Sequence, residues 1–342
     1  MRRAGNLYEA ICDPNNLRLA FLRARRGKES RQEVLTFSRN LSCNLKNLRK
    51  TLLNETLEVG NYHYFTIRDP KERTICAAAF PERVLHHAIM IPCDPVFERH
   101  QIFDSYATRR DKGTFAALER AKRFTRQDTW FLKLDIKRYF DSVDHAILKE
   151  EILRLFKDER LLRLLGRIID SYEKTPGKGI PIGNLTSQYF ANHFLSIADH
   201  FIKETINVRK YIRYMDDMVL WGMNKEELLN RGQKLESFLE NRLALALRPQ
   251  CMNRSETGVP FLGFRVFPDR TLLRPGSRWR FSRKMKRLHE EYRSGAISQE
   301  DFGSKAEALT AHVAHASTRG FRQSVLKKLG VAQGLEPRDS WR

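Results

Sequence analysis

The sequence predicts an α+β fold in which helices accompany short antiparallel strands. The stretch YIRYMDDMVLW, residues 211–221, has two apolar and β-branched runs around a short acidic centre, a pattern typical of a hairpin. The stretch YHYFTIRDPKERTICAA contains the turn DPKE between TIRD and RTIC and predicts a second hairpin. Helical spacing is seen in LTSQYFANHFLSIADHFIKE, where Phe190, Phe194, Ile197 and Phe201 form one apolar stripe.

The remaining elements follow from residue spacing and from residues that begin or end helices. Residues 1–60 are predicted to be helical, and PERVLHHAIMIPCDPVF should begin a helix that ends before Pro92, because proline lacks the amide donor. Asp141 and Asp144 are expected to cap the helix that follows them. Further along the chain we expect, in order, a helix over TFAALERAKRF, a strand opening TWFLKLDIKRYFDSV, a helix over HAILKEEILRLF, a glycine-rich loop at KTPGKGIPIGN, a helix over NKEELLNRGQKLESFLENRL, short strands at ALALR and FLGFRVF, and a basic helical tail from Arg274.

Charge and composition limit the classes of partner. The chain has 342 residues, a net charge of +21 and a pI near 10. An excess this large predicts nucleic acid as the partner, because phosphates attract Lys and Arg. A membrane surface is the alternative, but no run of 18 apolar residues is present, and the opening MRRAGNLYEAICD is not a signal peptide. Five scattered cysteines without C-x-x-C indicate a reducing cytosol, and His86-His87 has no third metal ligand at suitable spacing.

Three aspartates suggest metal-dependent chemistry. Asp216 and Asp217 are expected at the tip of the hairpin, where a two-residue turn would aim both carboxylates into one cleft; a solvated acidic turn is the alternative. Asp135 ends the apolar run WFLKLD, where an ionised acid is expensive to bury without a partner. If the strands are neighbours, the three carboxylates suit two divalent ions about 3.5–4 Å apart, as used in phosphoryl transfer. Mg²⁺ is the expected ion, with Mn²⁺ as an alternative.

The order of four motifs resembles a known family. LKLDIKRYF, GIPIGNLTSQYFANHFL, YMDD and FLGFRVF, within about residues 62–268, resemble the palm of reverse transcriptases, and DPKERTI and FDSYATRRDKG resemble their fingers. The resemblance implies a right-hand polymerase fold and RNA-directed DNA polymerase activity. It divides the chain into N-terminal helices and fingers (1–128), a palm (129–272) with a helical or fingers insertion at about 150–178, and a helical thumb with a C-terminal tail (273–342).

The resemblance also assigns roles to individual residues. Asp135 and Asp216 resemble the two principal metal ligands, and Asp217 resembles the third acid. Phe140 resembles the steric gate that packs under the incoming sugar and excludes a 2′-hydroxyl; a core aromatic is the alternative. Arg248 is nearest to a family lysine that protonates pyrophosphate, but the match is poor. The other matches are Lys71, Arg73 and Arg109 as triphosphate contacts or else solvated charges, Ile182 and Gln188 as nucleotide-binding positions, and Gly263 as the glycine of the primer grip.

One departure from the family pattern narrows the resemblance. Most reverse transcriptases carry Q-G-x-x-x-S-P, whereas this chain has Ile182-Gly183 and then Ser187-Gln188. This form resembles the enzymes of diversity-generating retroelements, which copy a non-coding template RNA with errors concentrated at adenines. The implied partners are template RNA, cDNA, dNTPs and a small basic accessory protein, with no membrane. A phage-defence reverse transcriptase and a catalytically idle RNA-binding scaffold are the alternatives.

Overall fold

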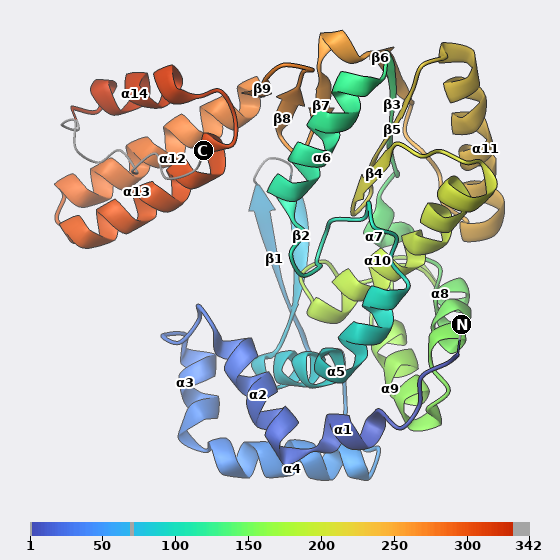
Figure 1. Ribbon diagram of the computed structural model, residues 1–342. Helices are drawn as coiled ribbons and strands as arrows, with labels where there is room; N and C mark the ends of the chain where they lie inside the picture. Colours follow the sequence, from blue (N-terminus) through green and yellow to red (C-terminus); the bar gives the residue numbers. More distant parts are fainter. Residues whose placement is uncertain (1, 69–71, 331–342) are drawn as a thin grey trace. The chain divides into compact units, whose positions relative to one another are not determined.

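The computed structural model describes residues 2–68 and 72–330 of the chain (Figure 1). The chain forms two compact units, each assembled from three segments. Unit 1 comprises Met1–Arg110, Asp135–Arg209 and Arg231–Pro249, and unit 2 comprises Asp111–Leu134, Lys210–Asn230 and Gln250–Arg342. The predicted division into fingers, palm and thumb follows other boundaries and stays a prediction.

Unit 1 is predominantly helical, as expected for its first 60 residues. Its helices are α1 (Tyr8–Cys12), α2 (Pro14–Arg25), α3 (Gln32–Arg39), α4 (Leu41–Leu53), α5 (Phe80–Arg99), α7 (Tyr139–Ser142), α8 (His145–Leu155), α9 (Glu159–Asp170), α10 (Leu185–His200), the π-helix η1 (Phe201–Thr205) and the later part of α11 (Lys225–Leu243). Strands β1 (Tyr62–Arg68) and β2 (Glu72–Ala78) form an antiparallel hairpin that pairs Tyr62 with Ala78. The predicted hairpin is confirmed, although its tip lies outside the described residues.

Helix α5 contains two prolines. The prediction that it ends before Pro92 is wrong, because α5 continues to Arg99 with Pro92 and Pro95 inside it. A proline inside a helix leaves the carbonyl four residues earlier without its usual donor. For Pro92 that carbonyl belongs to Ala88, and the side-chain amide of Asn16 donates to it at 2.9 Å. Helix α2 therefore supplies the hydrogen bond that the proline removes, which no local pattern in α5 could indicate.

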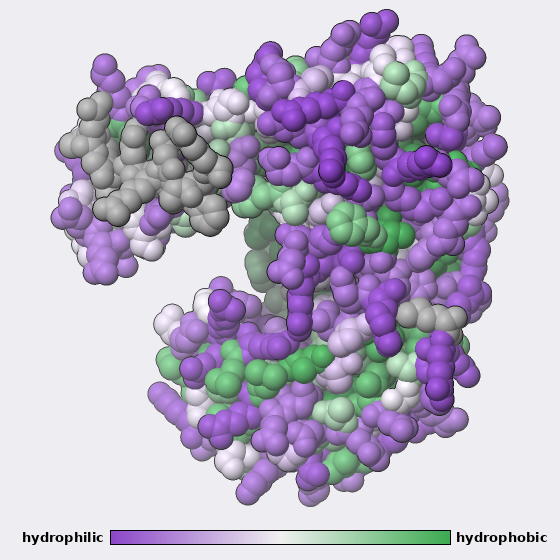
Figure 2. Space-filling model, in the orientation of Figure 1, coloured by the Kyte–Doolittle hydropathy of each residue, from purple (hydrophilic) through white to green (hydrophobic). Residues whose placement is uncertain are grey.

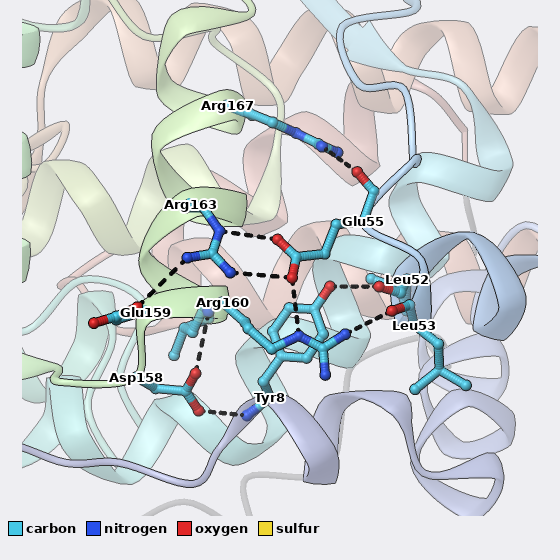
Figure 3. Close-up of polar contacts among 10 residues, drawn as sticks. Tyr8, Leu52, Leu53, Glu55, Asp158, Glu159, Arg160, Arg163 and Arg167 are labelled. Carbon is cyan, nitrogen blue, oxygen red and sulfur yellow. Dashed lines mark hydrogen bonds and ion pairs between the residues drawn. The ribbon is translucent and has the colours of Figure 1, made fainter.

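A stripe of arginines on α9 fastens the segment that follows α4. Arg160 and Arg163 donate to the carboxylate of Glu55 at 3.1 and 2.9 Å, and Arg167 donates to its backbone carbonyl at 2.8 Å (Figure 3). Spacings of three and four residues place the three arginines on one face of α9. Arg160 also lies over the ring of Tyr8, 4.3 Å from its centroid. These contacts tie the N-terminal helices to α9.

Unit 2 contains two antiparallel sheets, four complete α-helices and the first part of α11 among its described residues. One sheet has the order β4-β5-β3-β6 and the other the order β7-β8-β9. Their strands are β3 (Trp130–Asp135), β4 (Tyr211–Tyr214), β5 (Asp217–Gly222), β6 (Cys251–Arg254), β7 (Val259–Phe261), β8 (Phe264–Val266) and β9 (Thr271–Leu273). The helices are α6 (Thr114–Gln127), α12 (Pro275–Arg293), α13 (Gln299–Ala314) and α14 (Arg319–Lys328), with a 3₁₀ turn η2 (Ser255–Thr257). The α+β class is confirmed.

Two further expectations are corrected. The strand expected at ALALR does not form: this segment pairs through one isolated bridge, between Leu247 and Ile136. Leu245 of this segment is 1% exposed and Leu247 is partly exposed, whereas Ala244 and Ala246 are exposed, so the apolar pattern reflects the burial of one leucine and not a strand. Asp144 caps α8 as predicted, accepting from two backbone amides, whereas Asp141 lies inside the short helix α7 and caps nothing further along.

The face of the protein in Figure 2 is mostly hydrophilic, and apolar residues appear there as smaller patches. Among residues 2–68 and 72–330, no helix combines the length and the apolar character that crossing a membrane requires.

Candidate active site

The β4–β5 hairpin carries the two adjacent acids. Tyr214 pairs with Asp217, so the two turn residues are Met215 and Asp216. The prediction that both acids occupy the tip is wrong for Asp217, which is the first residue of β5. Met215 has a φ of 52°, the left-handed conformation that primed hairpin turns use and that costs a non-glycine residue about 1–2 kcal/mol. The register therefore separates the two carboxylates, one in the turn and one on the strand.

Lys133 of β3 places a positive charge beside Asp217. Its Nζ lies 2.6 Å from Oδ1 of Asp217 and donates to the carbonyl oxygen of Pro260 at 2.8 Å. The two side chains are 20% and 25% exposed, so solvent screens this ion pair less than it screens a surface pair. Asp217 thus faces a fixed cation from the neighbouring strand.

A second cation lies beneath the turn. Arg213 of β4 is fully buried, and its guanidinium donates to the carbonyl oxygen of Met215 at 3.3 Å. Sequence reasoning missed both Arg213 and Lys133. The sequence contained a signal for both residues, because each is a single cation in an otherwise apolar strand. Burying a charge there without a partner would cost free energy.

The strand that ends at Asp135 is the neighbour of β5. Thr129 Oγ1 lies 3.9 Å from Met223 Sδ, and Lys133 contacts Asp217, so β3 and β5 run antiparallel. The carboxyl end of β3 and the amino end of β5 consequently lie at the same end of the sheet.

Asp135 is the last residue of β3, and its own contacts lie in unit 1. Arg248 Nε lies 3.1 Å from Oδ2 of Asp135, and the Arg248 amide donates to the Asp135 carbonyl at 2.8 Å. In the family resemblance, Arg248 is only a poor match to a lysine. The structure instead places its guanidinium on the acid that ends β3, so Asp135 and Asp217 each contact a basic side chain.

Phe140, the predicted steric gate, lies on α7 in unit 1. Its ring is partly exposed and contacts the ring of Tyr139 edge-on, with centroids 5.7 Å apart. Tyr139 is the buried member of the pair and donates its hydroxyl to Ala191 at 2.5 Å. Because Tyr139 fills the core position, Phe140 keeps part of its ring accessible, and its role at the sugar stays a prediction.

The loop that carries Ile182 is attached to β2. The amide of Cys76 donates to the carbonyl of Ile182 at 2.9 Å, and the amide of Ala78 donates to the side chain of Asn184 at 3.0 Å. Gly183 lies between them with a φ of 120°, and a Cβ on it would lie 2.8 Å from Cγ2 of Ile75. The side chain of Ile182 is partly exposed. The predicted nucleotide-binding loop is therefore joined by hydrogen bonds to the β1–β2 hairpin, which is predicted to belong to the fingers.

The predicted basic contacts differ in their surroundings. Arg109 is a structural residue by its contacts: it is 8% exposed and pairs with Glu98 at 2.6 Å. It also donates to the carbonyls of Ile102 and Ser105. Arg73 lies exposed on β2, and Lys71 lies outside the described residues. Their contacts with a triphosphate stay predictions, and for Arg109 such a contact would require its present hydrogen bonds to change.

Gln188 and Gly263 have defined local roles. The side-chain oxygen of Gln188 accepts from the Thr108 hydroxyl at 3.4 Å, which joins α10 to the loop after α5. Gly263, with a φ of 85°, and Leu262, with a φ of 49°, form the two-residue turn between β7 and β8. Ser277 donates to the Gly263 carbonyl at 2.8 Å and holds this turn.

Unit 1 also contains a basic cavity of about 660 Å³. It is lined by Arg23, Arg26, His87, Met90, Ile91, Arg110, Leu185 and Tyr189. Burial, together with the neighbouring charge of Arg23, lowers the pKa of His87 to about 4. His87 is therefore neutral at pH 7, and the arginines supply the positive charge of the cavity.

The donor groups suit a hard divalent ion. No group of three or more His, Cys, Asp or Glu side chains is gathered as a metal site within residues 2–68 and 72–330. Mg²⁺, however, commonly uses one or two carboxylates and completes its octahedron with water and substrate phosphates. The carboxylates of Asp135 and Asp217 are donors of this type, but each is paired with a basic side chain, Arg248 or Lys133, that competes with a divalent ion. The complete set of three ligands stays a prediction.

The chain is similar in sequence to several known proteins. A sequence model of the family described as "Reverse transcriptase (RNA-dependent DNA polymerase)" matches residues 40–266. The putative COX1/OXI3 intron 1 protein of Saccharomyces cerevisiae is 21% identical over 135 residues, covering 37% of this chain and 16% of the yeast protein. Protein YkfC of Escherichia coli is 23% identical over 292 residues, covering 70% of this chain and 75% of that protein.

Other relatives are longer than this chain. The group II intron-encoded protein LtrA of Lactococcus lactis is 26% identical over 305 residues, covering 65% of this chain and 50% of LtrA. The chain thus spans half or less of the length of two of these three relatives. Among solved structures, apo telomerase from Candida tropicalis has a TM-score of 0.48 and 12% identity, covering 79% of this chain and 59% of that chain.

Proposed function

Because the chain belongs to the reverse transcriptase family, we propose that it is an RNA-directed DNA polymerase that copies template RNA into cDNA from dNTPs. The observation that carries the proposal is the β4–β5 hairpin of unit 2, which has Asp216 in its turn and Asp217 at the start of β5. Together with Asp135, the acid that ends β3, this hairpin supplies the residue types that phosphoryl transfer by two metal ions uses. An idle scaffold would not need them.

The proposed metal ligands are Asp135, Asp216 and Asp217. Mg²⁺ bound there would activate the primer hydroxyl and offset charge on the leaving pyrophosphate, with Mn²⁺ as an alternative ion. Phe140 lies under the incoming sugar in this proposal, and Gly263 belongs to the primer grip. The proposed nucleotide contacts are Lys71, Arg73, Arg109, Ile182 and Gln188.

Positive charge supports RNA as the template. The net charge is +21, and the basic cavity presents Arg23, Arg26 and Arg110 beside apolar residues that suit a base. Binding should weaken as salt rises, with a slope of about −0.7 for each single-strand phosphate neutralised. The proposed location of the reaction is the cytoplasm, and the free cysteines Cys12, Cys43, Cys76, Cys93 and Cys251 support this proposal.

The form of the second palm block supports a finer proposal. Ile182-Gly183 with Ser187-Gln188 favours a diversity-generating retroelement, with copying that is error-prone at template adenines and a small basic accessory protein as partner. The antiviral reverse transcriptases remain the second candidate, because their catalytic residues need not differ. Flanking DNA with an adenine-divergent repeat pair and an accessory gene would decide for the retroelement.

Substitution of one metal ligand tests the polymerase proposal. Asp216→Asn should abolish primer extension on an RNA template, because losing a charge beside two ions removes about 3 kcal/mol or more of transition-state stabilisation. RNA binding, which depends on the distributed basic surface, should be nearly unchanged. Asp269→Asn is the matched control, since Asp269 is an exposed acid of unit 2 that pairs with Arg270 at 2.7 Å.

The polymerase proposal would be rejected if the wild-type protein did not extend a primer with dNTPs on RNA under any divalent ion. The metal-ligand assignment alone would be rejected if Asp135→Asn or Asp216→Asn kept substantial polymerase activity.

A further inference from the structure

Lys133 joins two separate sheets of unit 2. It extends from β3, contacts Asp217 at the start of β5 at 2.6 Å, and donates to the Pro260 carbonyl of β7 at 2.8 Å. Strand β7 pairs with β8 across the Leu262–Gly263 turn. One ammonium group therefore connects an acid of the active-site hairpin to the backbone of the predicted primer-grip hairpin.

The surroundings fix the position of this ammonium group. Lys133 Nζ lies 5.8 Å from the centroid of the Phe261 ring, so an aromatic face covers it in addition to its two oxygen partners. The lysine side chain is 20% exposed. A lysine on the surface would sample several rotamers, whereas three groups from two strands hold this one.

We propose that Lys133 is a positioning residue for the reaction: it holds the carboxylate of Asp217 in register with the β7–β8 hairpin. This inference rests on the proposed polymerase function. Its ammonium also competes with a divalent ion for Asp217, because a positive charge at hydrogen-bond distance repels a second cation. In the free protein Lys133 therefore weakens divalent-ion binding at Asp217 while it improves the geometry of the reaction.

Three variants separate these effects. Lys133→Met removes the charge and both hydrogen bonds, and Lys133→Arg keeps a charge and donors. Lys225→Met is the matched control, because it removes an exposed lysine of the same unit whose Nζ lies 5.5 Å from the Trp130 ring. If Lys133→Met does not fold, Lys133→Gln replaces it, since glutamine keeps a donor but no charge.

Two measurements test the inference. In single-turnover primer extension, Lys133→Met should lower the maximal rate about tenfold, with partial recovery in Lys133→Arg and no change in Lys225→Met. In Mn²⁺ titrations followed by electron paramagnetic resonance, without nucleotide, Lys133→Met or Lys133→Gln should bind Mn²⁺ about threefold or more tightly than wild type. Lys133→Arg and Lys225→Met should match wild type.

The two measurements also separate failure of this inference from failure of the proposed function. Unchanged or weaker Mn²⁺ binding in the Lys133→Met variant, or an unchanged maximal rate, would overturn the role of Lys133 while wild-type polymerisation stands. A wild-type protein that does not polymerise would overturn the proposed function, and the Mn²⁺ titration would still report whether Lys133 competes for Asp217.

Discussion

A methyl group at Gly183 should damage the nucleotide-binding loop more than its backbone angle alone predicts. Gly183 has a φ of 120°, and a Cβ there would lie 2.8 Å from Cγ2 of Ile75 and 3.5 Å from the carbonyl oxygen of Cys76. Backbone strain of this kind costs about 1–3 kcal/mol. Overpacking against a fixed neighbour adds about 1–3 kcal/mol. Since hydrogen bonds to β2 hold the loop on both sides of Gly183, it has little freedom to move away.

Gly177 is the matched control in the same glycine-rich loop. It has a φ of 70°, and a Cβ on it would meet nothing within 4 Å. Gly177→Ala should therefore cost only the left-handed backbone strain, about 1–2 kcal/mol. We expect Gly183→Ala to lower the free energy of unfolding by about 2 kcal/mol more than Gly177→Ala does, because only Gly183 adds the collision.

Urea unfolding followed by circular dichroism measures both variants, and primer extension reports the loop. Ile75→Ala removes the atom that the new methyl would meet, so Gly183→Ala combined with Ile75→Ala should recover part of the loss in a double-mutant cycle. Equal destabilisation by the two glycine substitutions, or strict additivity in the cycle, would refute the collision and leave only backbone strain.

Three other changes have defined outcomes. Phe140→Ala should raise ribonucleotide incorporation about tenfold in single-nucleotide insertion assays, because the partly exposed ring no longer fills the space of a 2′-hydroxyl; an unchanged ratio of rNTP to dNTP incorporation would make Phe140 a packing residue. Ile182→Gln should lower misincorporation several-fold opposite template adenine, since a hydrogen bond of about 0.5–1.5 kcal/mol then favours correct pairs; the Cys76 amide still reaches the main-chain carbonyl, and cDNA sequencing that gives equal error frequencies at adenine would end this proposal. Burial lowers the pKa of His193 to about 3, so the unfolded chain binds a proton that the folded chain excludes. Stability should be complete above pH 6.5 and fall by at most about 1.4 kcal/mol per pH unit between 6.5 and 3 through this group. His193→Gln should flatten that part of the pH profile in urea titrations, and a profile with the wild-type slope would contradict the assignment.

Local patterns in the sequence determined the α+β class, both predicted hairpins, most helices and the choice of Asp135, Asp216 and Asp217. Strand alternation and helical spacing are properties of neighbouring residues, so they can be recognised without the fold. The family motifs had the same local character: each is a short run whose order along the chain is informative. For this reason the polymerase family could be identified before any distance was known.

Tertiary structure decided the features that depend on residues distant in sequence. Helix α5 continues past Pro92 because the carbonyl of Ala88, which the proline leaves without a donor, accepts from the side chain of Asn16. Asn16 precedes Pro92 by 76 residues. The hairpin register, not the composition of its tip, placed Asp217 on the strand. Lys133 and Arg248 became the partners of the two strand-end acids through contacts that span 84 and 113 residues. A buried or half-buried charge needs compensation, but the sequence does not state which cation supplies it, because chain topology alone brings the two together.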